Sequence, residues 1–167
     1  MDHSKGSTSQ SFMLPISLPN LGVVADGFLA GAIGAASFAL YFLAVDLARA
    51  EPFATPSLVG AVVLEGASLA PRSVDLGIVA AYSLVHAALF AAFGVAASWL
   101  VSRLRAVPAS PLLALLCFLA LEVGFLAATS VFAPGLGSTI GHGVVAGGNA
   151  LAAAVVALYL RSVRAAG

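Results

Sequence analysis

The chain has 167 residues, of which 61% are hydrophobic and 8% are charged, against about 25% charged residues in an average soluble domain. A water-soluble protein of this composition could not cover its surface with polar groups, so an ordinary soluble fold is excluded. Seven basic residues balance seven acidic ones. No net field therefore favours nucleic acid, which is excluded as a partner.

The first part of the sequence, residues 1–12, is polar and lacks the charged-then-apolar order of a cleavable signal peptide. Pro15 and Pro19 follow it and disfavour a regular helix. We expect residues 1–20 to form a disordered tail and an extended approach along the membrane surface.

Four long apolar stretches follow, at residues 21–48, 76–101, 111–133 and 139–160. Each is longer than the ~18 residues that a helix needs to cross the ~30 Å hydrocarbon core of a bilayer. In lipid, a helix satisfies all its backbone polar groups internally. The sequence therefore predicts an all-α membrane protein, a multi-pass four-transmembrane-helix bundle in which residues 21–164 form a single domain surrounded by the lipid bilayer.

The basic residues predict how the bundle is oriented, because short cytoplasmic loops are enriched in Lys and Arg. With the N-terminus in the cytoplasm, two basic residues, Arg49 and Arg72, lie outside. The other five lie inside: Lys5, Arg103, Arg105, Arg161 and Arg164. We therefore expect both termini to be cytoplasmic.

One apolar segment, residues 57–70, is too short to cross the membrane, since fourteen residues span only ~21 Å as a helix. Prolines flank it on both sides. We expect a helix that lies at the outer interface or caps the bundle there, with a re-entrant half-helix as the alternative. Glu65, near its middle, is tolerable at the interface and costly at depth.

Small residues recur at helical spacing, in Gly27-xxx-Gly31 and Gly143-xxx-Gly147. Such pairs let helix backbones approach closely in lipid. We expect them to serve packing within the bundle, with a homodimer face as the alternative.

Three polar residues on three helices fall at one depth near the bilayer midplane. Counting ~1.5 Å per residue places His86, Glu122 and Asn149 each about 15 to 16 Å from a membrane surface. A carboxylate at that depth is expected to be paired or protonated, and His86 is its natural partner. Three interpretations are open. The residues form a structural hydrogen-bond network, they form a proton or metal site, or they face different sides of their helices and do not meet. A metal ion would need three or more ligands, and only His86 and Glu122 qualify well, so the sequence leaves the metal undetermined.

A second polar layer is expected nearer the outer surface, formed by Asp46, Glu65, Thr129 and His142. Because His142 and Asn149 are seven residues apart, they share a helix face and should both point into the bundle. The alternative is that Asp46 and His142 are simple interfacial residues. His86 and His142 differ in depth by ~12 Å, which argues against a haem held by both, and no other cofactor is identified.

Residues 45–66, VDLARAEPFATPSLVGAVVLEG, followed by residues 81–94, AYSLVHAALFAAFG, resemble a group of small uncharacterised bacterial membrane proteins. The resemblance covers the first helix through the second. It implies a four-helix fold in the bacterial inner membrane and a polar histidine in the second long helix, here His86. It implies no catalytic residue.

The sequence favours a non-enzymatic protein of the bacterial inner (cytoplasmic) membrane, an accessory subunit whose partners are other membrane subunits. The reasons are its short loops, its many small residues and the lack of a catalytic or cofactor motif. One alternative is a small transporter or proton- or metal-handling protein that uses His86 and Glu122. Another is a membrane enzyme that acts on a lipid or quinone.

Overall fold

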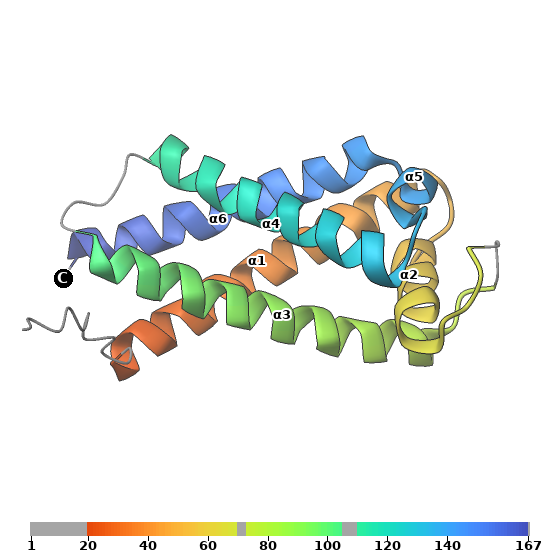
Figure 1. The fold of residues 1–167 in the computed structure, drawn as a ribbon, viewed down its shortest axis with the longest axis horizontal. Coiled ribbons are helices and arrows are strands. Elements are labelled where there is room, and N and C mark those ends of the chain that lie inside the picture. The colour runs from red at the N-terminus through yellow and green to blue at the C-terminus, as the bar shows by residue number, and fades with distance from the viewer. Residues whose placement is uncertain (1–19, 70–72, 105–109, 167) are drawn as a thin grey trace, which may run out of the picture.

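The computed structural model describes residues 20–69, 73–104 and 110–166, and their regular elements are all helices (Figure 1). The six helices are α1 (Leu21–Ala48), α2 (Ala54–Glu65), α3 (Leu76–Arg103), α4 (Ser110–Phe132), α5 (Leu136–Ile140) and α6 (His142–Ala166). Four of these, α1, α3, α4 and α6, are long and apolar enough to cross a membrane. The predicted all-helical class and the four long apolar helices are thus confirmed for the described residues. The predicted disordered tail lies outside the described residues, apart from Asn20.

Side-chain caps explain where two of the spans begin. The side chain of Asn20 accepts a hydrogen bond of 2.9 Å from the backbone N–H of Val23 at the start of α1. Asp75 does the same for Gly77, at 2.8 Å, at the start of α3. Each cap satisfies a backbone donor that the first helical turn leaves free.

Three predicted helix boundaries differ from the structure, and glycine explains two of them. The fourth apolar stretch does not form one helix from residue 139, because Gly141 has a φ of 99° and separates α5 from α6. The short apolar segment is helical from Ala54 rather than from residue 57. It ends at Glu65, where Gly66 adopts the left-handed conformation with a φ of 65°. Residue 70 lies outside the described residues.

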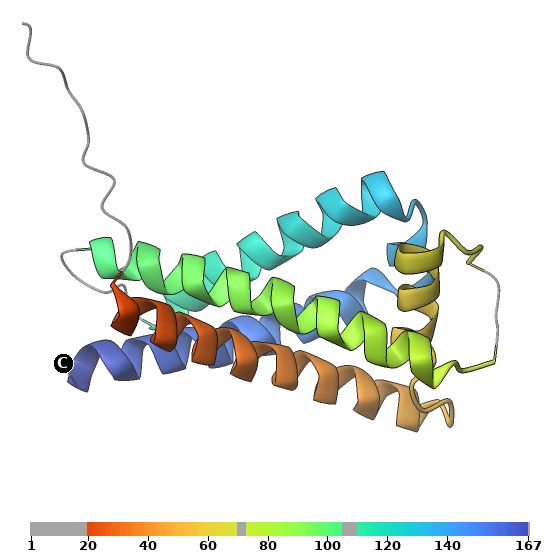
Figure 2. The same cartoon turned by 90° about the horizontal axis from the view of Figure 1, so that it is seen from below.

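The long helices pack as a row rather than as a closed ring. Helix α1 packs along α3 and α6, and α6 packs along α4, whereas α3 and α4 make little direct contact. Figure 2 shows α4 diverging from α3 toward the end of the molecule where α2 lies. Helix α2 crosses that end and packs mainly on α3. The row therefore runs α3, α1, α6, α4, and it stays open between its two outer members.

Glycines bring α1 and α3 into backbone contact. A methyl group added to Gly27 would lie 2.5 Å from the Cα of Val95, and one added to Gly94 would lie 2.8 Å from the Cα of Gly31. The predicted role of Gly27-xxx-Gly31 in packing within the bundle is thus confirmed.

In the second predicted small-residue pair, Gly143-xxx-Gly147, only one glycine lies at a close contact. A methyl group on Gly147 would meet the ring of Tyr41, whereas Gly143 faces open space.

Candidate functional site

Two of the three predicted midplane residues meet in the structure. The side-chain amide of Asn149, on α6, donates a hydrogen bond of 2.9 Å to Oε1 of Glu122, on α4. Asn149 is 4% exposed, and Glu122 is partly buried. The bond gives the partly buried carboxyl group a polar partner among apolar helices, where an unpaired charge is costly. Counting residues from the helix ends therefore found a real pair.

His86 does not join this pair. Its ring packs between those of Phe38 and Phe90, with centroid distances of 4.9 and 4.6 Å, and the ring of Tyr82 lies 5.8 Å away. Its Nε2 atom is buried, and no described residue forms a hydrogen bond with it. An unpartnered polar atom in such surroundings costs about 1–3 kcal/mol of stability.

The packing order explains why the expected bond between His86 and Glu122 is not found among the described residues. Helix α4 packs on α6, so Glu122 meets Asn149. Helix α3 packs on α1, so His86 meets the aromatic side chain of Phe38. The residues lie at one level but face different helices.

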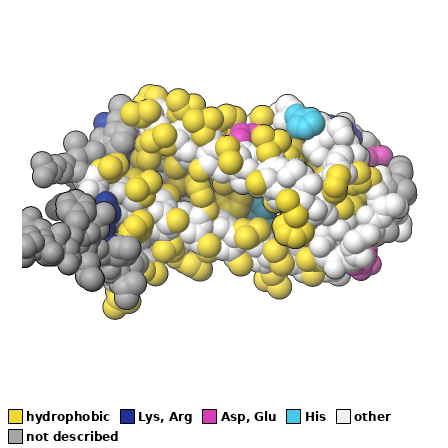
Figure 3. Space-filling model, in the orientation of Figure 1, with side chains coloured by type: hydrophobic (Ala, Val, Ile, Leu, Met, Phe, Trp, Pro, Cys, Tyr) yellow, Lys and Arg dark blue, Asp and Glu magenta, His cyan; other side chains and the backbone are white. Residues whose placement is uncertain are grey.

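In the second half of α4, one face of the helix is uncovered and borders a cleft toward α3. Cys117 is buried and Leu121 packs against the core, but the residues one heptad later on the same helix face, Gly124 and Ala128, are exposed. A methyl group added to Gly124 would meet no atom within 4 Å. Figure 3 shows this side of the molecule recessed along its middle between two rows of hydrophobic side chains. We call this recess the α3–α4 cleft.

The four residues of the expected outer layer have separate surroundings. The Thr129 hydroxyl donates to the carbonyl oxygen of Phe125 in its own helix, at 2.8 Å. Glu65 is exposed at the last position of α2. His142 is exposed, and a methyl group on Gly137 would lie 2.8 Å from its Nε2, so it does not share the buried environment of Asn149.

Asp46, the fourth member, has a structural role. It is 1% exposed, and its carboxylate accepts hydrogen bonds from the backbone N–H of Thr55, at 2.9 Å, and from the Thr55 hydroxyl, at 2.6 Å. Ser57 lies in the same turn of α2, and its hydroxyl accepts a bond of 3.0 Å from the N–H of Asp75. The sequence analysis missed Thr55 and Ser57, although a Thr-Pro-Ser run at a helix start is a signal for such bonds.

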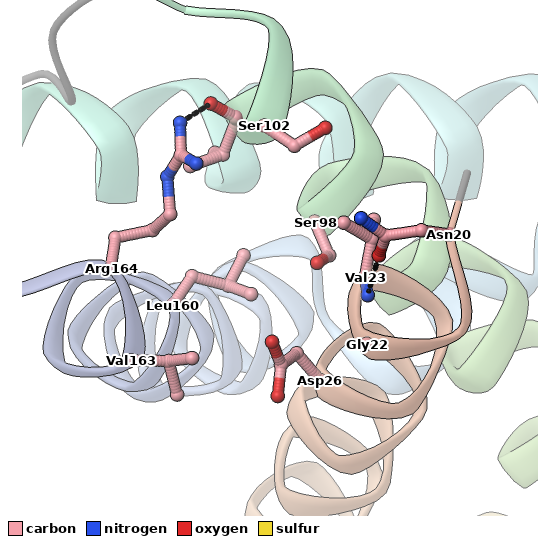
Figure 4. A pocket seen from close by; sticks show the side chains of 10 residues that line it. Asn20, Gly22, Val23, Asp26, Ser98, Ser102, Leu160, Val163 and Arg164 are labelled. Atoms are coloured by element: carbon pink, nitrogen blue, oxygen red, sulfur yellow. Dashed lines mark hydrogen bonds between the residues drawn. The ribbon is translucent and has the colours of Figure 1, made fainter. Parts of the chain in front are cut away.

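Asp26 was not among the predicted site residues. It lies in a cavity at the opposite end of the molecule, together with Ser98 and Arg164 (Figure 4). A charged residue inside an apolar stretch is the signal that points to it.

The chemistry that these residues can support is hydrogen bonding at buried positions. Within the described residues, no three His, Cys, Asp or Glu side chains gather as metal ligands would. Among the three predicted midplane residues, the structure shows one hydrogen-bonded pair, Glu122–Asn149, and one buried atom without a partner among the described residues, Nε2 of His86. No protein-family model, characterised protein or solved structure matches this chain.

Proposed function

We propose that the protein is a non-enzymatic accessory subunit of a membrane complex, and that a transmembrane helix of its partner fills the α3–α4 cleft. The observation that carries the proposal is the separation of α3 and α4. In a four-helix protein acting alone, closing the row would bury these two faces against each other. Here one face of the second half of α4 stays uncovered, and Gly124 and Ala128 on that face are exposed.

Small residues on this face suit a second helix. Gly124 and Ala128 stand four residues apart, the spacing that lets another backbone approach closely in lipid. Phe125, between them in the sequence, packs into the core and so bounds the exposed strip on one side. A partner helix with its own small residues would fit this strip.

His86 supplies a polar feature for the same partner. Its Nε2 atom is without a hydrogen bond among the described residues. Because this atom is buried between aromatic rings, a serine, threonine or amide side chain of the partner helix would reach it only after the imidazole turned toward the cleft. The hydrogen bond formed would contribute about 1–2 kcal/mol in a membrane. This bond would also fix the partner's register.

The distribution of arginines supports the proposed orientation, with both termini in the cytoplasm. Arg103, Arg161 and Arg164 lie where α3 and α6 end, whereas Arg49 follows the end of α1 on the opposite side. Arg103 also lies 5.0 Å from the ring of Trp99, a residue type enriched at membrane interfaces. The bacterial inner membrane is proposed from the sequence resemblance described above.

Site-specific photocrosslinking in the native membrane tests the proposal. A photoreactive residue at position 124 is expected to crosslink to one defined membrane protein. The matched control is position 123, where Val123 is 65% exposed on another face of α4 and is expected to contact lipid only. Gly124→Leu should abolish the association without unfolding the protein, because its Cβ meets no atom, while Val123→Leu should leave it intact.

The same experiment distinguishes the second candidate, an enzyme that acts on a lipid or quinone. The aromatic rings around His86 favour it, because a flat carbonyl compound could stack there and accept a hydrogen bond from the imidazole. A monomer that carries a bound lipophilic molecule, has an intrinsic activity and gives no protein crosslink at position 124 would contradict the accessory function.

A further inference from the structure

A cavity of about 300 Å³ lies where α1 begins and where α3 and α6 end (Figure 4). Three helices contribute polar side chains to its lining: Asp26 from α1, Ser98 and Ser102 from α3, and Arg164 from α6. Asp26 is five residues from the start of α1 and Ser98 is five residues from the end of α3. Both therefore lie about 8 Å along the helix axis from that end of the molecule, within the interfacial zone of a bilayer.

Asp26 is the acidic group of this cavity. Figure 4 shows its carboxylate directed into the space between α6 and Ser98. No hydrogen bond or ion pair joins it to another described residue, although it is partly buried. A carboxylate in a membrane helix normally has a cationic or hydrogen-bonding partner, because solvation there is poor. A ligand cation would supply that partner.

Arg164 is the basic group of the cavity, and one nitrogen of its guanidinium group is hydrogen-bonded to α3. Its Nη2 donates a hydrogen bond of 2.9 Å to the carbonyl oxygen of Val101 at the end of α3. The other guanidinium nitrogens form no hydrogen bond with described residues, so they can still donate. A guanidinium group in this position suits the oxygens of a phosphate.

The cavity thus offers one negative and one positive group, with aliphatic walls that include Val23 and Leu160. A simple anion would meet Asp26, and a simple cation would meet Arg164. A zwitterion satisfies both. We propose that this cavity binds a phosphoethanolamine group, with its ammonium on Asp26 and its phosphate on Arg164. Such a group is carried by an aminophospholipid, whose glycerol and acyl chains would follow the aliphatic walls, or it is free in solution.

Native mass spectrometry of the full chain in detergent tests this inference. The protein is mixed with equal amounts of phosphatidylethanolamine and phosphatidylglycerol, which differ in the headgroup and its ammonium. We expect at least tenfold more bound phosphatidylethanolamine. Equal retention of the two lipids by the wild-type protein overturns the inference, and this comparison requires no variant.

Two matched variants locate the site. Asp26→Asn should lower phosphatidylethanolamine binding to the level of phosphatidylglycerol. Glu51→Gln, an exposed carboxylate at the opposite end of the molecule, should change nothing. An unchanged lipid preference in Asp26→Asn would contradict the assignment.

Competition with soluble phosphoethanolamine distinguishes the two sources of the group. If it displaces the bound lipid, the headgroup alone carries recognition and the free compound is also a ligand. If only the lipid binds, the aliphatic walls contribute and the source is the membrane. Both results support the site, and neither depends on the partner helix proposed above.

Discussion

Asp46, in the last turn of α1, holds the first turn of α2 through two hydrogen bonds to Thr55. The backbone N–H of Thr55 donates to Oδ2 at 2.9 Å, and its hydroxyl donates to Oδ1 at 2.6 Å. The residue that precedes α2, Phe53, has a left-handed conformation and gives no side-chain cap. Asp46 therefore supplies, from another helix, the acceptor that an N-cap residue usually supplies.

Loss of this carboxylate is expected to destabilise the protein. Asp46→Ala leaves the part-buried N–H and hydroxyl of Thr55 without their acceptor and should lower the free energy of unfolding by about 2–3 kcal/mol. Asp46→Asn keeps one acceptor oxygen and should cost about half as much. Chemical unfolding in detergent measures both, and Glu51→Ala, at an exposed carboxylate of the same turn region, is the control. Equal stability of Asp46→Ala and wild type would show that the bonds contribute nothing.

The glycine contact between α1 and α3 predicts a second effect. In Gly94→Ala, the new methyl group would lie 2.8 Å from the Cα of Gly31 and would push the two helices apart. Overpacking of this kind costs about 1–3 kcal/mol, so the melting temperature in detergent should fall.

Gly124→Ala is the matched control for this prediction. It lies in a long helix like Gly94, but its methyl group would meet no atom within 4 Å. The higher helix propensity of alanine should raise stability by up to about 1 kcal/mol. A similar loss of stability in both variants would mean that the close contact of α1 and α3 is not responsible.

Hydropathy predicted the four long helices because the thickness of a bilayer sets the length of an apolar helix. Counting residues along these helices predicted which polar groups could lie level with one another. Rotation about each helix axis is set by its neighbours, which hydropathy does not encode. Asn149 and Glu122 were placed at one level and do meet, whereas His86 at that level faces Phe38.

The sequence does contain some information on which helices are neighbours. Gly94 in α3 complements Gly27 and Gly31 in α1, and this match could have predicted the α1–α3 pair. The break at Gly141 could not be predicted in the same way, because glycines are also frequent inside membrane helices.

The Glu122–Asn149 bond predicts different effects for two substitutions of Glu122. Glu122→Gln keeps an acceptor oxygen for the Asn149 amide and should be mild. Glu122→Leu leaves that buried amide without an acceptor and should cost about 1–3 kcal/mol in thermal or chemical unfolding. Asn149→Leu should lower the free energy of unfolding by at least as much, because it leaves the carboxyl group of Glu122 without its hydrogen-bond donor.

The same pair separates a structural role from proton handling. If Glu122 carries protons, Glu122→Gln should abolish function with stability intact, because an amide does not titrate at neutral pH. If the role is structural, activity and assembly should follow stability through the series. Wild-type stability in Glu122→Leu would mean that Glu122 has no buried partner.

His86 should behave in the opposite way to Glu122. His86→Phe keeps a ring between Phe38 and Phe90 and removes a buried nitrogen that has no described partner. Because an unpartnered polar atom costs about 1–3 kcal/mol, the isolated variant should unfold at the same or a higher temperature than wild type.

In the native membrane, His86→Phe should weaken crosslinking from position 124, since the partner helix loses its polar contact in the α3–α4 cleft. A variant that is stable alone and defective in association would therefore assign His86 to recognition. If His86→Phe instead destabilises the isolated protein as much as Glu122→Leu does, the imidazole has a partner within its own chain. The cleft would then lose its polar feature, and with it the reason to expect a partner helix in a fixed register.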